Sequence, residues 1–334
     1  MKRIGFILLL CVLFAQCDFI NDVYREIPIR KHKLNYTSQD CRAFQGTPAW
    51  ELAKAVDDND TLEIVKILKK QPDLIDYGDP VWGYTVLMQS INNKHYEAFM
   101  TLLKLGADVD IHEMKNGASA IHMAVETRDV RYVEAVLRHG AIINEFGRGC
   151  RKSGWSVGST VSPLMLAVRD ASYWEKDMTI VKYLIEHGAD PDMNFSDGFT
   201  ALNQALINED YDLAIYLIES GANYTIPMYR IKEATVDSTV WEPYSIQQYV
   251  DECKGIIPSP RKNYVPKEMS DSQYNRLTEL ISQPYVPKTI TRYLYDESND
   301  KKDKRTRITE HVYAADGRKK EPHPNPLPCF EVKL

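Results

Sequence analysis

The sequence predicts an all-α repeat fold: a solenoid of helix pairs joined by β-hairpin fingers, followed by a C-terminal extension of mixed structure. Four segments of the chain align with one another, and each ends in a Gly-Ala pair that begins at Gly106, Gly140, Gly188 or Gly221. Apolar residues recur at helical spacing before each pair. No such pair follows Gly221, so we expect the repeats to end near Tyr224 and a different structure to follow.

The composition is that of an ordinary globular protein, and it limits the classes of function. Of 334 residues, 44% are hydrophobic and 26% are charged, so the chain can bury a sizeable core. The formal net charge of −6 argues against a dedicated nucleic-acid-binding protein, which usually carries a basic surface. Only one apolar run is long enough to consider as a membrane segment, and this excludes a multi-pass membrane protein.

The chain begins with the pattern of an export signal. Lys2 and Arg3 precede an apolar run from Ile4 to Phe14, and small residues follow it. The run is too short to span a bilayer as a finished helix, which needs about 20 residues. We therefore predict a signal peptide over residues 1–17 and a protein exported to the periplasm or cell envelope.

The fate of this signal has two alternatives. In one, it is cleaved before Asp18; in the other, Cys17 is the lipid-modified residue. Residues 13–17 resemble the lipobox of bacterial lipoproteins, with departures from that pattern at Phe14 and Gln16. The resemblance implies a lipid anchor at Cys17 as the membrane attachment, and Asp18 implies retention at the inner membrane, facing the periplasm. Residues 18–47 are polar and irregular and are predicted to be a linker.

Cysteine usage is compatible with export. Outside the predicted signal the chain has Cys41, Cys150, Cys253 and Cys329, an even number that permits two disulfides in an oxidising compartment. Four unpaired thiols are the alternative. No Cys-x-x-Cys pair or Cys/His cluster has the spacing of a metal site, so we expect neither a metal nor a cofactor.

The aligned segments also share their openings. Each begins with Ser or Thr before an apolar stretch, as at Ser119, Ser162 and Thr200, and Asp or Asn residues follow most of the Gly-Ala pairs. This pattern resembles the ankyrin repeat, whose marks are a Thr-Pro-Leu-His-x-Ala opening and a period of 33 residues. The resemblance implies repeats over residues 48–225, divided into a degenerate capping repeat at 48–78 and further repeats at 79–112, 113–146, 158–193 and 194–225. It leaves residues 226–334 as a C-terminal cap and extension.

Particular residues have mechanical roles in such a repeat. Gly106, Gly140, Gly188 and Gly221 follow the second helices, where a left-handed C-cap is expected. His122 matches the histidine of the family's opening motif, and we expect it to tie the turn together with a hydrogen bond rather than to bind a ligand or act as a base.

The spacing of the repeats locates two insertions. Gly140 and Gly188 are 48 residues apart, whereas Gly106 and Gly140 are 34 apart. We place the extra residues in a long finger over 145–161 and in the turn between two helices over 170–177. Insertions in repeat proteins lie in loops on one face, which is often the binding face.

The C-terminal extension mixes several patterns. Residues 236–252 suggest one helix or a decayed sixth repeat, and residues 270–282 suggest a helix behind a Ser270-x-x-Gln273 capping box. Residues 289–295 alternate like a strand, and the charge run at 297–307 is expected to be a solvated loop.

No catalytic motif stands out, so we predict a non-enzymatic, monomeric scaffold that binds another protein. Exported bacterial ankyrin proteins resemble immunity proteins that neutralise toxins delivered to the periplasm, such as phospholipase effectors, and this is one alternative. An enzyme with a site near His311 or His323 in the extension is the other.

Partner contacts are expected on the concave face, the long finger and the inter-helix insertion, because Trp, Tyr and Arg there are the types that most often dominate binding. Matching the family's concave positions to this chain implies Asn92, Asn93, Glu126, Thr127, Arg169, Asp170, Ile207 and Asn208. The finger adds Arg148, Arg151, Lys152 and Trp155, and the inter-helix insertion adds Tyr173 and Trp174.

Overall fold

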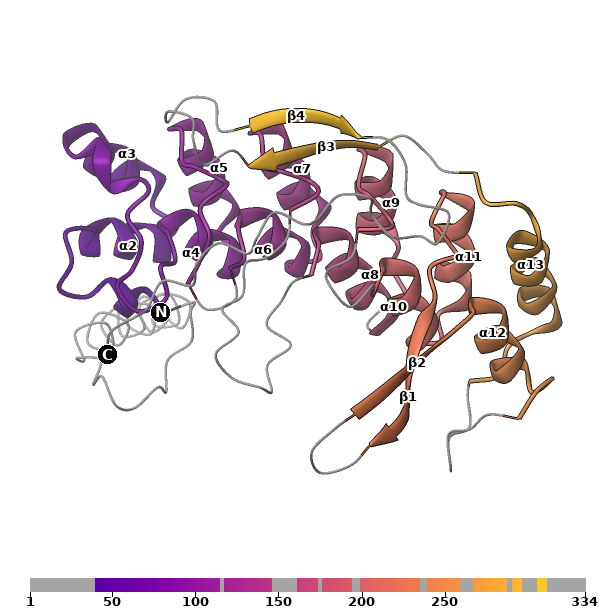
Figure 1. Cartoon of the computed structure of the whole chain (residues 1–334). Helices are drawn as coiled ribbons and strands as arrows, with labels where there is room; N and C mark the ends of the chain where they lie inside the picture. The colour runs from indigo at the N-terminus through magenta and orange to yellow at the C-terminus, as the bar shows by residue number, and fades with distance from the viewer. Residues whose placement is uncertain are drawn as a thin grey trace, which may run out of the picture. The chain divides into compact units, whose positions relative to one another are not determined.

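The computed structural model of the chain describes residues 40–114, 117–145, 161–173, 176–193, 199–234, 239–258, 267–286, 290–295 and 305–310. It divides into two compact units, residues 1–114 and 115–334, and each is described by itself (Figure 1). The predicted signal at 1–17 lies outside the described residues, as does most of the predicted linker at 18–47. Within the described ranges, no helix is long and apolar enough to cross a membrane.

The first unit consists of two helix pairs with short 3-10 turns. In chain order the elements are a 3-10 helix Cys41–Phe44, α2 Trp50–Asp57, α3 Thr61–Lys70, a 3-10 helix Pro72–Leu74, α4 Val86–Asn92 and α5 Tyr96–Lys104. Helix α2 packs on α4 and α3 packs on α5, and fully buried Leu52, Ile64 and Phe99 lie in this core. Burying such side chains contributes roughly 1.5–3 kcal/mol each, which is the main force that holds the pairs together.

The second unit continues the same pattern with further helix pairs and two hairpins. The elements are α6 Ala120–Glu126, α7 Val130–Arg138, α8 Pro163–Tyr173, α9 Thr179–Glu186, α10 Ala201–Ile207, α11 Tyr211–Glu219, β1 Met228–Ala234, β2 Thr239–Tyr244, α12 Ile246–Lys254, α13 Asp271–Ser282, β3 Ile290–Tyr295 and β4 Arg305–Glu310. Helix α8 packs between α6 and α10, and α7 packs on α9. Ile121, Tyr132 and Leu164 are fully buried there.

The glycines that end the second helices have the predicted conformation. Their φ angles lie between 93° and 103° at Gly106, Gly140, Gly188 and Gly221, in the region that favours glycine. The next residue then bonds back into the helix, as Ala107 N does to Leu102 O at 3.1 Å. These C-caps are confirmed.

The turns between the two helices of the first five pairs also need a left-handed residue, but none of them has a glycine at that position. Asn59, Lys94, Arg128, Lys176 and Glu209 have φ angles between 54° and 61°. The left-handed conformation costs an ordinary residue roughly 1–2 kcal/mol. Asparagine adopts this conformation readily, so the turns at Lys94, Arg128, Lys176 and Glu209 are the ones that lower the stability of the fold.

Replacing Lys94 with Gly is expected to raise the free energy of unfolding by about 0.5–1 kcal/mol, because the strain removed exceeds the chain entropy that Gly adds. Lys94 is exposed and has a φ of 58°. Lys94→Ala removes the same side chain but keeps the strain, so this control should gain nothing. Urea titration of both variants measures the difference, and equal midpoints would contradict the expectation.

Polar residues after the Gly-Ala pairs tie successive repeats together. Asn144 Oδ1 accepts a hydrogen bond from Asp190 N at 2.7 Å, and its amide donates to Gly188 O at 3.0 Å. Asp192 Oδ1 in turn accepts from Asn223 N at 2.6 Å. These side chains are nearly fully buried, so each bond satisfies a backbone group that water cannot reach. The register of one repeat is thereby passed to the next.

His122 has the expected structural role. Its side chain is 3% exposed. Nδ1 accepts from Ser119 N at 3.3 Å, and Nε2 lies 3.2 Å from Val161 O, which opens the following repeat. The prediction that this histidine ties the turn together is confirmed, and its reach extends beyond its own turn.

In their described residues, the fingers between repeats contain little regular strand. In the described residues of the first finger, a single antiparallel bridge joins Gly78 to Thr85. The long finger predicted over 145–161 lies almost wholly outside the described residues. The hairpin β1–β2 comes directly after the last Gly-Ala pair, where the next finger would begin, with Met228 opposite Tyr244.

The prediction of one helix over residues 236–252 is wrong in its first half. Residues 239–244 form strand β2, and α12 begins only at Ile246. Pro243 explains the difference, because a proline cannot occupy a helix interior. Ser245 then caps α12 in a capping box with Gln248, Oγ accepting from Gln248 N at 3.1 Å.

The helix predicted over residues 270–282 is confirmed as α13, with its Ser270 and Gln273 capping box. It packs on α11 and α12, and Arg276 Nη2 binds Glu219 Oε1 at 2.6 Å. Tyr249 Oη donates to Leu206 O at 3.0 Å from within α12. Helices α12 and α13 therefore form a sixth helix pair that stacks on the fifth (Figure 1).

The strand predicted at residues 289–295 is confirmed as β3. The charge run at 297–307 is corrected at its end, because residues 305–310 form β4 and pair with β3. Thr306, Ile308 and Thr309 in β4 are β-branched, and such residues favour strands. Their pairing with β3 outweighs the basic residues that suggested a loop.

Candidate protein-binding site

Helix α8 differs from its counterparts, and this difference creates the candidate site. It has 11 residues, whereas α4, α6 and α10 have seven each. The insertion predicted over residues 170–177 thus begins as an additional helical turn, which ends at Tyr173. Ser172 Oγ donates to Val168 O at 3.0 Å, and Ala171 is buried under this turn.

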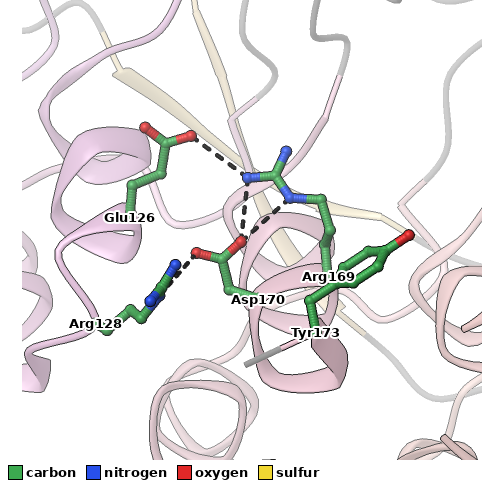
Figure 2. A pocket seen from close by; sticks show the side chains of 5 residues that line it. All are labelled: Glu126, Arg128, Arg169, Asp170 and Tyr173. Carbon is green, nitrogen blue, oxygen red and sulfur yellow. Dashed lines mark hydrogen bonds and ion pairs between the residues drawn. The ribbon is translucent and has the colours of Figure 1, made fainter. Parts of the chain in front are cut away.

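The extra turn stands over a shallow, open hollow of about 460 Å³ beside the end of α6. Its lining residues are Glu126, Arg128, Arg169, Asp170 and Tyr173 (Figure 2). Glu126 and Arg169 lie 43 positions apart in the sequence. Four of these five residues are among those predicted for partner binding, and the structure brings them together.

Four charges alternate along the hollow. Arg169 Nη2 lies 3.5 Å from Glu126 Oε1 and 3.2 Å from Asp170 Oδ1, and Arg169 Nε also lies 3.2 Å from that oxygen. Arg128 Nε lies 3.7 Å from the other carboxylate oxygen of Asp170 (Figure 2). Asp170 is therefore held between two guanidinium groups, and the four residues together carry no net charge.

The outer members of this network are accessible and loosely held. The side chain of Asp170 is only 14% exposed, but those of Arg169 and Glu126 are 41% and 54% exposed. Partial desolvation raises the pKa of Glu126, and Asp170 adds to the rise, whereas Arg169 opposes it. Contacts of 3.5 Å in such a setting contribute little, so a partner can replace them at low cost.

Tyr173 gives the hollow an aromatic edge. Its side chain is 68% exposed and projects from the last turn of α8 (Figure 2). Together the residues offer guanidinium donors, a carboxylate acceptor and an aromatic ring. This set can bind polar and apolar groups of a protein surface, and it contains no arrangement of nucleophile and base.

The other predicted binding residues do not join this hollow. Asn92 is half-buried, and Asn93 donates to Asp57 Oδ1 at 3.1 Å in the first unit. Thr127 is buried and its hydroxyl donates to Ala124 O at 2.7 Å, so it serves the end of α6. Ile207 is 44% exposed, and Asn208 accepts from Gln204 at 3.1 Å.

Several predicted residues lie outside the described residues: Arg148, Arg151, Lys152, Trp155 and Trp174. Arg128 is the one lining residue that the sequence does not predict, although it follows Thr127 directly. Its left-handed backbone turns it toward Asp170, and this is the signal that a repeat alignment alone does not contain.

Disulfides and a metal site are the other chemistry considered for this chain. Cys41 and Cys253 are buried, and Cys150 and Cys329 are outside the described residues, so the disulfide alternatives remain predictions. Among the described residues, no group of three or more His, Cys, Asp or Glu side chains could hold a metal ion.

Two family models for ankyrin repeats match the chain, one over residues 52–146 and the other over residues 168–218. The helix pairs within these ranges are therefore ankyrin repeats, and the protein is an ankyrin repeat protein. The predicted all-α repeat fold is confirmed. Repeats of this class are protein-binding scaffolds and are typically non-enzymatic.

The chain is also similar to two known proteins over a fraction of their length. The mouse B-cell lymphoma 3 protein homolog is 39% identical over 62 residues, which is 19% of this chain and 14% of that protein. A Fowlpox virus (strain NVSL) protein named for its ankyrin repeats, FPV031, is 26% identical over 163 residues, or 48% of this chain and 42% of that protein. The chain thus spans less than half of either relative.

Proposed function

We propose that this protein is a non-enzymatic scaffold that binds a protein partner in the hollow formed by Glu126, Arg128, Arg169, Asp170 and Tyr173. The observation that carries the proposal is the extra turn of α8, which places Asp170 and exposed Tyr173 beside the end of α6. The partner, its location and a monomeric state of the scaffold belong to the proposal. No nucleic acid, metal or cofactor has a role in it.

The residue types support a binding role for this hollow. Tyr and Arg are enriched among the few residues that dominate protein interfaces. A turn that serves the repeat alone needs no exposed tyrosine, and Tyr173 is 68% exposed. Arg169 bonds Asp170 at 3.2 Å but reaches exposed Glu126 only at 3.5 Å, so a partner can replace the contact with Glu126 at small cost to the fold.

Tyr173→Ala is expected to lower partner affinity about tenfold or more while changing the free energy of unfolding by less than about 0.5 kcal/mol. The probe is the tagged full chain, used to capture proteins from an envelope fraction that are then identified by mass spectrometry. Tyr183→Ala is the matched control, because Tyr183 lies on α9, stacks on His187 at the end of that helix and does not line the hollow. A partner retained equally by wild type and both variants would contradict the proposed site.

The location proposed for this scaffold is the periplasm or cell envelope. The support is the signal pattern over residues 1–17, which the described residues do not include. Removal of the signal or lipid attachment at Cys17 is expected, and intact-mass measurement of the cell-associated protein distinguishes them. Cys17→Ser should abolish lipid attachment and leave plain cleavage unaffected. A protein that retains residues 1–16 in the cytosol would overturn export.

A narrower form of the proposal is an immunity protein that neutralises a toxin delivered to the periplasm. It requires that the captured partner be such a toxin, for example a phospholipase, and that Tyr173→Ala abolish the protection. The enzymatic alternative depends on His311 and His323, which lie outside the described residues, and no observation favours it.

A further inference from the structure

Two neighbouring fingers in the first unit form a second surface, separate from the hollow. The first finger, residues 77–85, is closed at its base by the bridge between Gly78 and Thr85. The second, residues 105–114, lies against it, since Met114 N donates to Trp82 O at 2.6 Å. We use the name finger surface for the set of residues Asp76, Val81, Trp82, Asp108 and Met114.

The tips of the two fingers expose apolar side chains. Val81 is 43% exposed and Met114 is 57% exposed, and Trp82 between them is partly exposed. A Cβ placed on Gly83 would lie 2.9 Å from Met114 Cγ, so the tips are in close contact. A partly exposed Trp beside an exposed Met on neighbouring loops is typical of a binding surface rather than of a core.

The bases of the same fingers carry acidic groups. Asp76 Oδ1 accepts from Asp108 N at 2.8 Å, so these carboxylates lie close together. Burial raises the pKa of Asp76, and the charge of Asp108 adds to the rise. Neither forms an ion pair with a described residue, and residues 71–93 and 105–114 contain no Lys or Arg at all.

We propose that the finger surface binds a basic segment of a protein partner, with an aromatic or aliphatic residue of that segment seated at the Val81, Trp82 and Met114 tips. The acidic base attracts Lys or Arg side chains, and the tips bury the apolar anchor. Because tip and base are about six residues apart along one finger, an extended segment of about six residues can reach both. This proposal is independent of the hollow in the second unit.

Charge complementarity decides the kind of partner. Residues 40–114 contain 13 Asp and Glu but only seven Lys and Arg, so the unit repels acidic segments. The basic residues near its exposed helices, such as Lys66 and Lys54, are paired with Glu63 and Glu51. The carboxylates beside the fingers are left to attract the basic groups of a partner.

The test uses a displayed library of random peptides of about 12 residues, selected on the full chain. We expect enrichment of peptides that combine Lys or Arg with an aromatic or aliphatic residue. One enriched peptide is then synthesised, and its affinity is measured for each variant. Trp82→Ala is expected to weaken binding about tenfold or more. Met114→Gln tests the same tip at an exposed position and should weaken it about threefold.

The acidic base is tested by Asp76→Asn with Asp108→Asn. Asparagine keeps the acceptor oxygen, as Asn144 does at the corresponding place in the second unit, so the fold should persist. Affinity should fall about threefold to tenfold at 0.1 M salt and approach that of the wild type at 1 M, where the Debye length drops from about 10 Å to about 3 Å. Glu51→Gln with Glu63→Gln is the control, with equal charge change on exposed helix positions.

Enrichment of acidic or neutral peptides would overturn the proposal, as would peptides that bind Met114→Gln and the Asp76, Asp108 double variant as tightly as the wild type. Capture of an envelope partner through Tyr173 is measured separately. The peptide measurements and the capture measurement use different variants and different probes, so failure of the finger surface and failure of the hollow are distinguishable.

Discussion

Asp79→Ala is expected to lower the free energy of unfolding by about 3 kcal/mol, the largest effect we foresee from one substitution. Asp79 is fully buried in the first finger. Its Oδ1 accepts from Val81 N at 2.8 Å and from Trp82 N at 2.9 Å, and its Oδ2 accepts from Tyr84 N at 2.7 Å. Alanine leaves all three amides without this acceptor.

Burial of the Asp79 carboxylate offsets part of the stabilisation that the three hydrogen bonds provide. Desolvation raises the pKa of Asp79, whereas the three amides lower it. We therefore expect a loss of about 3 kcal/mol and not the sum of three charged hydrogen bonds, which would be larger. Asp79→Asn should fall between wild type and Asp79→Ala, because its single oxygen accepts two of the bonds and its amide nitrogen accepts none.

Urea titration with a constant slope measures these losses. Asp73→Ala is the control, since Asp73 is an exposed acid nearby, in a 3-10 turn. If Asp79→Ala costs no more than Asp73→Ala, the carboxylate does not organise the finger. Asp79→Ala should also weaken binding of the basic peptide, because Asp79 positions Val81 and Trp82.

His122→Ala is expected to cost about 2–3 kcal/mol, the second-largest effect. Since Nδ1 accepts the amide of Ser119, Nε2 carries the proton and donates to Val161 O, across the 3.2 Å separation. The substitution leaves the buried amide of Ser119 and the part-buried carbonyl of Val161 without these bonds. It also leaves a cavity where the ring was.

His122→Asn separates the two bonds. Asn203 occupies the matching place in a later repeat, and its Oδ1 accepts from Thr200 N at 2.9 Å. An asparagine at 122 should therefore keep the bond to Ser119 and lose the bond to Val161, at about half the cost of alanine. A negligible loss for His122→Asn would mean that the bond between repeats contributes nothing, and equal losses for the two variants would mean the same of the bond to Ser119. A negligible loss for His122→Ala would contradict the role of His122 altogether.

Much of the repeat structure can be predicted because its signals are local. The Gly-Ala pairs mark helix ends through a left-handed backbone that glycine adopts easily, and all four show it. Ser270 and Gln273 mark the start of α13 through hydrogen bonds within one turn. Pro243 is a local signal against a helix, and the prediction of one helix from residue 236 gives it no weight. Helix α12 in fact begins ten residues later, at Ile246.

The candidate site can be predicted only as a set of positions. Repeat alignment selects Glu126, Arg169 and Asp170, and composition selects Tyr173 in the insertion. The lengthening of α8 by a turn is not predicted, because the residues of the insertion carry no period of their own. Arg128 escapes the prediction because its placement depends on a left-handed turn without glycine.

Local chemistry in the chain was enough to specify helix pairs, their order and their caps, since each depends on residues within a few positions of one another. The meeting of Glu126 with Arg169, of Asp76 with Asp108 and of Trp82 with Met114 arises from packing of successive repeats. Such contacts join residues about 30 to 45 positions apart, and no pattern along the chain encodes their distance or their burial. Which exposed residues lie side by side was therefore decided by how the repeats stack, because stacking determines which charges are paired and which side chains water can reach.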